Sequence, residues 1–382
     1  MAHRSPKAPV KRGYPYQIES VERACQLMRV LQDQGSLPLF ELARKVGLSR
    51  PTAFRLLATL QANGIVLKDG SRKYRLAAGS PSQRRYKIGY AAQTSEYGFS
   101  RAVTRSVVDC AAQSNVDLVL LDNQYSPDVA LANAEKLLAE KVDLLMEFQT
   151  HSQVAALISA QASKHRVPLI AIEIPHPDAT YFGVDNCQAG IAAGRYLARW
   201  AEQHWMGQID EILLVGMPQA GPLPESRLTG SLLGIRQILP NSGNSKISVL
   251  SGNGQLEASR EAVKRHLKSS TACRVLVTAI NDLSAIGALE AFKDAERQEH
   301  CAVVGQNGSI EGRLEMRKPN SRFLGSIAYF PERYGEQLIA LAFDILLRRN
   351  APPRAVFIKH QLLTPGNLKQ LYGREMRSAK AS

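Results

Sequence analysis

The chain of 382 residues carries a formal net charge of +14, and 45% of its residues are hydrophobic. This length predicts two or three domains with buried cores and excludes a small scaffold held together by disulfides. The five cysteines are scattered without a C-x-x-C pair, so we expect a reduced, intracellular protein with neither a metal site nor a disulfide framework. No cofactor is expected.

The positive charge is concentrated near the N-terminus. Residues 1–86 contain 16 Lys and Arg against 5 Asp and Glu, a net charge of +11, whereas residues 87–382 contain 32 against 29, a net charge of +3. A concentrated basic segment attracts polyanions, of which nucleic acid is the usual one. Residues 1–17 are expected to be a basic disordered tail without the apolar run of an export signal, and no run reaches the roughly 18 apolar residues of a membrane span. We therefore expect a cytoplasmic protein with a DNA partner and no membrane contact.

Two helices are predicted after the tail. Apolar residues recur at helical spacing over residues 20–32 and again over 40–46. Gly47 ends the second pattern, because glycine tolerates the left-handed backbone that closes a helix. Ser49 is placed to cap a third helix, and Pro51 lies in its first turn, where the missing N–H has no helical partner to lose.

The third helix has two distinct faces. Its apolar face consists of Ala53, Leu56, Leu57 and Leu60. The opposite face carries Arg50, Thr52, Phe54, Arg55 and Thr59. Cationic and hydroxyl side chains that lead the second helix of a tight pair are typical of a helix-turn-helix whose second helix enters the major groove. Phe54 could meet a thymine methyl group there, but we favour packing against a neighbouring helix.

A hairpin follows the helices. Residues 65–68 and 73–76 have strand character and flank an Asp-Gly turn. The whole predicts a small α+β winged helix-turn-helix domain over residues 18–78. The segments ESVERACQLMRVL, LFELARKVGLSRPTAFRLLATLQANGIV and KYRLA resemble the DNA-binding domain of IclR-type transcription regulators. The expected DNA contacts lie on the third helix and the wing and are Ser49, Arg50, Thr52, Arg55, Lys68, Arg72 and Lys73.

Beyond a basic linker at residues 79–85, strands alternate with helices. Strands are predicted at 87–92, 117–122, 143–148, 168–174, 211–216, 246–250, 274–279, 302–306 and 323–329. Strands separated by helices require parallel sheets covered on both faces. Because this many units exceed one comfortable open sheet, we expect two doubly wound α/β lobes with a ligand cleft at the C-terminal ends of their strands.

This region resembles the periplasmic-binding-protein type I fold that ribose-binding proteins share with LacI-type sensors. The resemblance rests on the order of KIGYAAQTSEYGFS, VDLLMEFQT, VPLIAIEI, YFGVDNCQAG, ESRLTGSLLGI, SGNGQLEASREAV, TAINDLSAIGALEAF and VVGQNGSIEG. It implies a hinge at Asp185 and Asn186 and a second crossover over 326–332. The expected parts are lobe 1 at 86–185 and 331–352, lobe 2 at 186–330 and 353–366, and a basic tail at 367–382.

The resemblance also implies a set of ligand contacts. Carried over by position, they fall on Gln93, Tyr97, Phe99, Gln149, Thr150, Glu173, Arg227, Asn281, Asn307 and Tyr329. Such a set suits a sugar or polyol, because aromatic rings stack on C–H surfaces while amide, guanidinium and carboxylate groups bond hydroxyls. Thr150 and Asn307 stand where an aspartate is common, and Ile174 where an arginine is common, which disfavours a ribose-like ligand. Arg227 could hold an anionic ligand, unless Glu96, Glu147 or Glu173 pairs with it.

No catalytic motif accompanies this architecture. SGNGQLE lacks the third glycine of a dinucleotide-binding turn, and the chain contains neither a P-loop nor a nucleophile elbow. We therefore expect a ligand-responsive transcription regulator rather than an enzyme. This regulator is expected to bind operator DNA as a homodimer and to sense a sugar, polyol or sugar acid. Two alternatives stay open: a regulator with a vestigial pocket, and a cytoplasmic solute-binding protein that does not regulate transcription.

Overall fold

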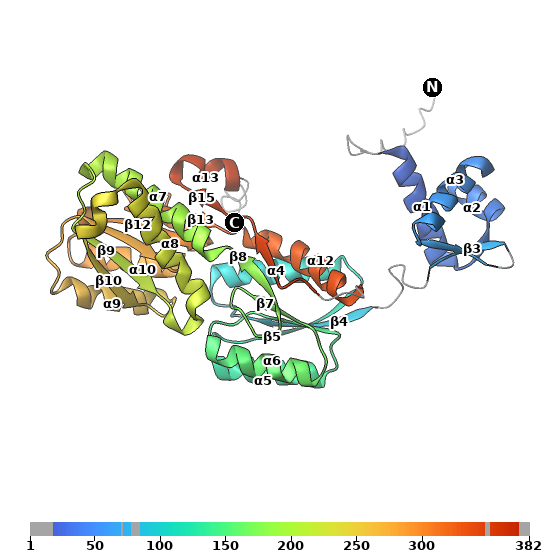
Figure 1. Cartoon of the computed structure of the whole chain (residues 1–382), viewed down its shortest axis with the longest axis horizontal. Coiled ribbons are helices and arrows are strands. Elements are labelled where there is room, and N and C mark those ends of the chain that lie inside the picture. Colours follow the sequence, from blue (N-terminus) through green and yellow to red (C-terminus); the bar gives the residue numbers. More distant parts are fainter. Residues whose placement is uncertain (1–17, 70–71, 78–84, 348–351, 374–382) are drawn as a thin grey trace, which may run out of the picture. The chain divides into compact units, whose positions relative to one another are not determined.

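The computed structural model describes residues 18–69, 72–77, 85–347 and 352–373 (Figure 1). The chain divides into two compact units, Met1–Arg84 and Arg85–Ser382. The expected tail at 1–17, nearly all of the expected linker and residues 374–382 lie outside the described residues. Within the described part of the chain, none of the helices combines the length and the apolarity that crossing a bilayer demands.

The smaller unit packs three helices against an antiparallel sheet of strand order β1-β3-β2. Gly47 ends α2 with a left-handed φ of 71°, and Ser49 caps α3 by accepting a hydrogen bond from the Thr52 backbone N–H at 3.3 Å. Leu27 and Leu57, from α1 and α3, are fully buried in its core. Its elements are α1 (Glu19–Gln34), β1 (Leu37–Pro38), α2 (Leu39–Val46), α3 (Arg50–Ala62), β2 (Val66–Lys68) and β3 (Lys73–Leu76). This is the predicted order of a winged helix-turn-helix.

The first lobe of the larger unit is a parallel sheet of order β14-β8-β7-β6-β4-β5. Helices α4 and α12 cover one face, and α5 and α6 cover the other (Figure 1). Because both faces are covered, all four residues of the central strand β6 are buried. The elements are β4 (Tyr86–Ala92), α4 (Gly98–Ala112), β5 (Val116–Asp122), α5 (Pro127–Ala139), β6 (Leu144–Glu147), α6 (Ser152–Lys164), β7 (Leu169–Ile172), β8 (Thr180–Val184), α12 (Tyr334–Leu347) and β14 (Ala355–Ile358).

The second lobe has the strand order β10-β9-β11-β12-β13-β15, in which only β15 is antiparallel among the described strands. Helices α7 and α8 lie on one face, and α9 and α10 on the other. The elements are α7 (Asn186–Trp205), β9 (Glu211–Gly216), η1 (Pro218–Ala220), α8 (Pro222–Ile238), η2 (Pro240–Asn244), β10 (Lys246–Ser251), α9 (Leu256–Leu267), β11 (Val275–Ala279), α10 (Asp282–Asp294), η3 (Gln298–His300), β12 (Cys301–Asn307), α11 (Ile310–Glu315), β13 (Phe323–Ala328), β15 (Gln361–Leu363) and α13 (Pro365–Tyr372).

The chain passes between the lobes after β8, after β13 through η4 (Pro331–Arg333), and between β14 and β15. The expected placement of residues 353–366 in lobe 2 is wrong for β14, because this strand pairs with β8 of lobe 1. The expected tail from residue 367 is wrong in part, because α13 buries Leu368 and Tyr372 in the core of lobe 2. Strands β8, β14 and β15 were not predicted; β14 and β15 pair with strands that are remote in sequence, β8 and β13, whereas β8 closely follows its partner β7.

Candidate functional site

The predicted ligand residues lie at the C-terminal ends of strands in both lobes. Gln93 follows β4, Thr150 follows β6 and Glu173 follows β7 in lobe 1, while Asn281 follows β11 and Asn307 ends β12 in lobe 2. These ends are where open α/β sheets bind ligands. The two lobes thus present the predicted residues toward a shared cleft.

Five of the ten predicted residues line one cavity between the lobes. Its volume is about 30 Å³, far below the ~300 Å³ at which small-molecule pockets begin. The predicted lining residues are Gln93, Tyr97, Phe99, Asn281 and Asn307. The cavity is also lined by residues that were not predicted as ligand contacts, namely Gly98, Tyr125, Gly254, Asp282, Leu283, Ser309 and Glu311, and all of these except Tyr125 lie in segments that carry the family resemblance. Gln149, Thr150, Glu173, Arg227 and Tyr329 are buried but do not line this cavity.

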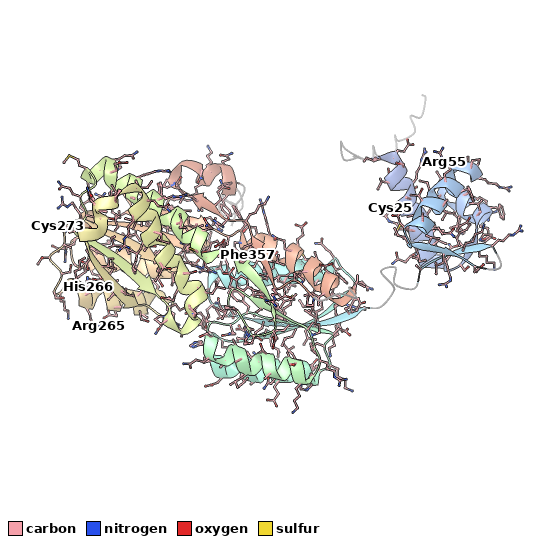
Figure 2. All side chains as sticks on the ribbon, in the orientation of Figure 1. Cys25, Arg55, Arg265, His266, Cys273 and Phe357 are labelled. Atoms are coloured by element: carbon pink, nitrogen blue, oxygen red, sulfur yellow. The ribbon has the colours of Figure 1, made fainter. Side chains whose placement is uncertain are left out.

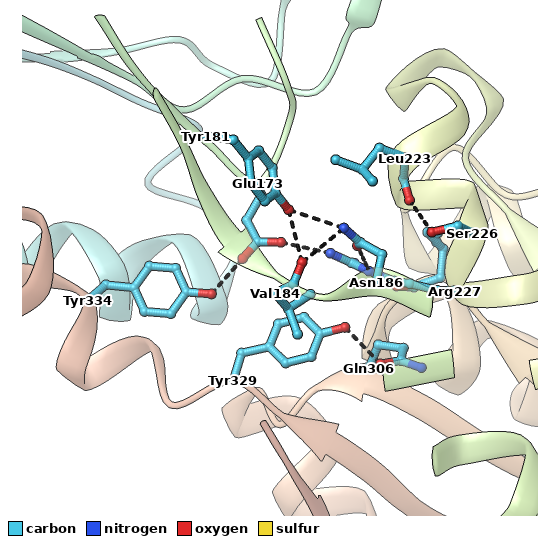
Figure 3. Close-up of polar contacts among 11 residues, drawn as sticks. Glu173, Tyr181, Val184, Asn186, Leu223, Ser226, Arg227, Gln306, Tyr329 and Tyr334 are labelled. Atoms are coloured by element: carbon cyan, nitrogen blue, oxygen red, sulfur yellow. Dashed lines mark hydrogen bonds and ion pairs between the residues drawn. The ribbon is translucent and has the colours of Figure 1, made fainter. Parts of the chain in front are cut away.

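Arg227, on α8 of lobe 2, is held entirely by protein groups (Figure 3). Its Nη2 donates to Glu173 Oε2 of lobe 1 at 2.7 Å, and its Nε donates to Asn186 Oδ1 at 2.6 Å. Its Nη1 donates to the carbonyl oxygen of Ile280 at 3.1 Å. The side chains of Arg227 and Glu173 are only 7% and 8% exposed. Of the partners that the sequence left open for Arg227, the structure selects Glu173.

Glu173 is a second centre of the same network. Its Oε1 accepts a hydrogen bond from the Tyr334 hydroxyl at 2.6 Å. Burial raises the pKa of Glu173, and the adjacent Arg227 guanidinium and Tyr334 hydroxyl oppose that rise. The ring of Tyr329 lies 5.1 Å from the Arg227 guanidinium, and its hydroxyl donates to Gln306 Oε1 at 2.7 Å. The network therefore joins both lobes and the second crossover.

The expected hinge residues lie at the start of α7, where the chain first crosses. Asp185 caps the helix by accepting a hydrogen bond from the Gln188 backbone N–H at 3.1 Å. Asn186 Nδ2 donates to the Val184 carbonyl oxygen and to the Tyr181 hydroxyl, both at 3.1 Å. Since Asn186 also binds Arg227, the first crossover is tied to the lobe-bridging ion pair (Figure 3).

Other contacts also close the lobes on each other. The backbone N–H of Gly98, the first residue of α4, donates to Glu311 Oε1 of lobe 2 at 3.0 Å. The Tyr125 hydroxyl of lobe 1 donates to the Asn253 carbonyl oxygen of lobe 2 at 3.0 Å. Ile174 packs in an apolar cluster with Met217, Ala220 and Ile280. The cleft is therefore closed by polar and apolar contacts together.

Several buried polar atoms near the strand ends have no partner among the described residues. These are Gln149 Nε2, Gln306 Nε2 and Glu147 Oε2. The other Glu147 oxygen accepts from Asn123 Nδ2 at 2.7 Å, and burial raises the pKa of Glu147 well above its usual range. A buried donor without an acceptor costs about 1–3 kcal/mol, so such groups need a specific reason to persist. In the described residues, His, Cys, Asp and Glu side chains form no group of three that could hold a metal ion.

The helix-turn-helix surface is cationic. Arg50 and Arg55 are exposed on α3, and Figure 2 shows Arg55 at the outside of the smaller unit. The guanidinium of Arg50 lies 5.6 Å from the ring centroid of Phe40 on α2. Ser49 and Thr52 bond each other through their hydroxyls at 2.8 Å, so both serve the helix cap. Phe54 is 49% exposed and lies outside the core cluster of this unit, and its packing against a neighbouring helix stays a prediction.

The predicted wing residues lie on the β2–β3 hairpin. Lys68, Arg72 and Lys73 are all exposed, and Lys68 Nζ lies 5.3 Å from the Tyr74 ring. Asp69 holds the turn by accepting a hydrogen bond from the Lys73 backbone N–H at 2.9 Å. The hairpin thus presents three exposed cationic side chains.

The larger unit matches a known family in sequence as well as in fold. Residues 88–349 match the family model described as a periplasmic binding protein domain. The chain belongs to the periplasmic binding protein domain family. Residues 20–70 match the model of the IclR helix-turn-helix domain, which makes the smaller unit an IclR-type DNA-binding domain. Both matched families are families of binding domains rather than of enzymes.

Curated relatives and solved structures match the periplasmic binding protein domain. The ribose import binding protein RbsB of Haemophilus influenzae is 24% identical over 276 residues, which cover 71% of this chain and 89% of that protein. A solute-binding protein of Bacillus halodurans C-125 with bound myo-inositol has a TM-score of 0.64 at 16% identity, covering 77% of this chain and 99% of its own. The Caulobacter myo-inositol binding protein has a TM-score of 0.62 at 19% identity, covering 75% and 96%. At these identities the solved structures establish the shared fold.

Proposed function

We propose that this protein is a transcription regulator that binds operator DNA through its IclR helix-turn-helix domain and a small ligand between its two lobes. The observation that carries the proposal is the presence of a DNA-binding domain and a ligand-binding fold in one chain. Relatives that import ribose, and solved structures with bound myo-inositol or D-allose, support a sugar or polyol as the ligand. The site of action would be the cytoplasm, where operator DNA lies.

In this proposal the ligand replaces contacts that now join the lobes. Hydroxyl groups would bond Gln93, Asn281 and Asn307, and the buried amides of Gln149 and Gln306 would supply further donors. Rearrangement at Asp185 and Asn186 would change the lobe arrangement and, through it, the affinity for DNA.

Two measurements on the full chain test the proposal. Isothermal titration with D-ribose, D-allose, myo-inositol and D-glucuronate identifies a ligand, and fluorescence anisotropy on duplexes selected from a random library measures DNA binding with and without it. We expect at least one compound to bind and to change DNA affinity at least fivefold, the lower end of ordinary allosteric coupling. If the library yields no enriched duplex, the DNA-binding function is overturned.

A second candidate is a constitutive DNA-binding protein with a vestigial pocket. It is favoured by the three protein partners of Arg227 and by the cavity of about 30 Å³. This candidate predicts selected duplexes that bind tightly, no heat from any compound, and no change of DNA affinity upon their addition.

We further propose a homodimer, because paired half-sites supply the specificity that one helix-turn-helix lacks. The sheet edges β5 and β10 occupy equivalent positions in the two lobes and expose Leu120 (41%) and Val249 (63%). Sedimentation velocity should give a dimer for the native chain and a monomer for Val249→Lys. Met206→Lys, at a residue that is 84% exposed elsewhere, is the matched control and should remain dimeric. A native chain that is monomeric both free and on DNA contradicts this proposal.

A further inference from the structure

The exposed stripe of α3 has an unusual composition for a surface helix. Its inner stripe is buried and consists of Ala53, Leu57 and Leu60. Its outer side is exposed and includes Arg50, Pro51, Phe54, Arg55, Ala58 and Thr59. No acidic residue occurs anywhere in α3. The helix thus offers a surface that suits a polyanion, and Phe54 is the large apolar side chain exposed on it.

The other polar side chains near the start of α3 already have partners. The hydroxyls of Ser49 and Thr52 lie 2.8 Å apart, and Ser49 also accepts the Thr52 backbone N–H. The guanidinium groups of Arg50 and Arg44 each lie 5.6 Å from the ring centroid of Phe40. Phe54 and Arg55 therefore remain as the large side chains that face outward from the first half of the helix.

Phe54 does not belong to the core of the smaller unit. It is 49% exposed and lies outside the apolar cluster formed by the three helices and the hairpin. Of the ten phenylalanines in the chain, only Phe40, Phe54 and Phe357 are exposed, and two of these three lie on the helix pair α2 and α3. An aromatic ring that is half exposed, lies outside the core cluster of its domain and stands beside Arg55 on the recognition helix is available to an apolar group on the DNA.

The major groove offers one such partner, the C5-methyl group of thymine, which distinguishes thymine from cytosine. We propose that Phe54 is a specificity-determining residue that contacts a thymine methyl group in the operator. This inference rests on the proposed DNA-binding function and assigns part of its sequence preference. Arg55, the neighbouring outward residue, would contact a guanine or a phosphate in the same groove.

The test removes the methyl group without changing base pairing. Duplexes selected from a random library by the full chain are remade with each thymine replaced in turn by deoxyuridine, and binding is measured by anisotropy. We expect one or two positions at which deoxyuridine weakens binding about fourfold, the factor that corresponds to one buried methyl group. Phe54→Ala should weaken binding to the parent duplex by at least that factor and lose sensitivity to deoxyuridine at those positions.

Phe40→Ala is the matched control, because Phe40 is 47% exposed on the neighbouring helix α2. This variant should retain the deoxyuridine sensitivity even if its affinity falls through Arg50. The inference is overturned if no thymine position responds in the native chain, or if Phe54→Ala responds as the native chain does. Failure to select any duplex would instead overturn the DNA-binding function, so the two failures are distinguishable.

Discussion

The substitution Glu173→Gln measures how strongly the lobe-bridging ion pair stabilises the closed domain. The variant keeps the size of the side chain but leaves the Arg227 guanidinium, which is 7% exposed, without a counter-ion. At the observed 2.7 Å and an effective dielectric constant of about 20, the Coulomb energy of the pair is ~6 kcal/mol. The glutamine oxygen can still accept a neutral hydrogen bond, so we expect the free energy of unfolding to fall by about 3–5 kcal/mol.

Urea unfolding followed by tryptophan fluorescence suits this measurement. Both tryptophans of the chain, Trp200 and Trp205, lie on α7, so the signal reports on the larger unit. The control is Asp109→Asn, which removes an ion pair with Arg105 whose side chains are 87% and 62% exposed. We expect the control to leave the unfolding curve unchanged, because exposed pairs contribute little. A loss below about 1 kcal/mol for Glu173→Gln would refute the reasoning, since it would mean that both charges are hydrated.

Three further predictions concern other parts of the chain. Burial raises the pKa of Asp282 to about 7, so between pH 4 and 7 the folded state holds a proton that the unfolded state has released. The free energy of unfolding should therefore fall, by up to about 4 kcal/mol, as the pH rises through that range. Asp282→Asn should flatten this part of the stability profile in urea unfolding at stepped pH, and an unchanged slope would contradict the assignment. Gly194→Ala should lower the unfolding free energy by about 1–3 kcal/mol in thermal melts, because the added Cβ would lie 2.0 Å from the Ser231 carbonyl oxygen. The control Gly243→Ala should be neutral, because its Cβ would meet nothing within 4 Å. Arg55→Ala should weaken binding to a selected duplex by about 1–3 kcal/mol in anisotropy titrations, far more than Lys7→Ala, and equal effects would mean that α3 is not the recognition helix.

Much of the fold could be predicted from the sequence because its signals are local. Gly47 and Ser49 mark the ends of α2 and α3 through their own backbone and side-chain chemistry, and the predicted bounds are observed. The nine apolar runs predicted as strands appear as β4, β5, β6, β7, β9, β10, β11, β12 and β13. Strands inside the sheets, such as β6 and β9, are buried on both faces, so their sequences are mainly apolar, whereas the edge strands β5 and β10 are partly exposed.

The sequence by itself thus determined the winged helix-turn-helix, the two α/β lobes and the families to which they belong. Only the tertiary structure decided which lobe takes β14, because that depends on pairing with β8, some 170 residues earlier in the chain. It likewise decided that Arg227 bonds Glu173 rather than leaving both for a ligand, and that Phe54 faces away from the core. Each of these outcomes depends on which surfaces meet after the chain has folded, and hydrophobic periodicity carries no information about such distant partners.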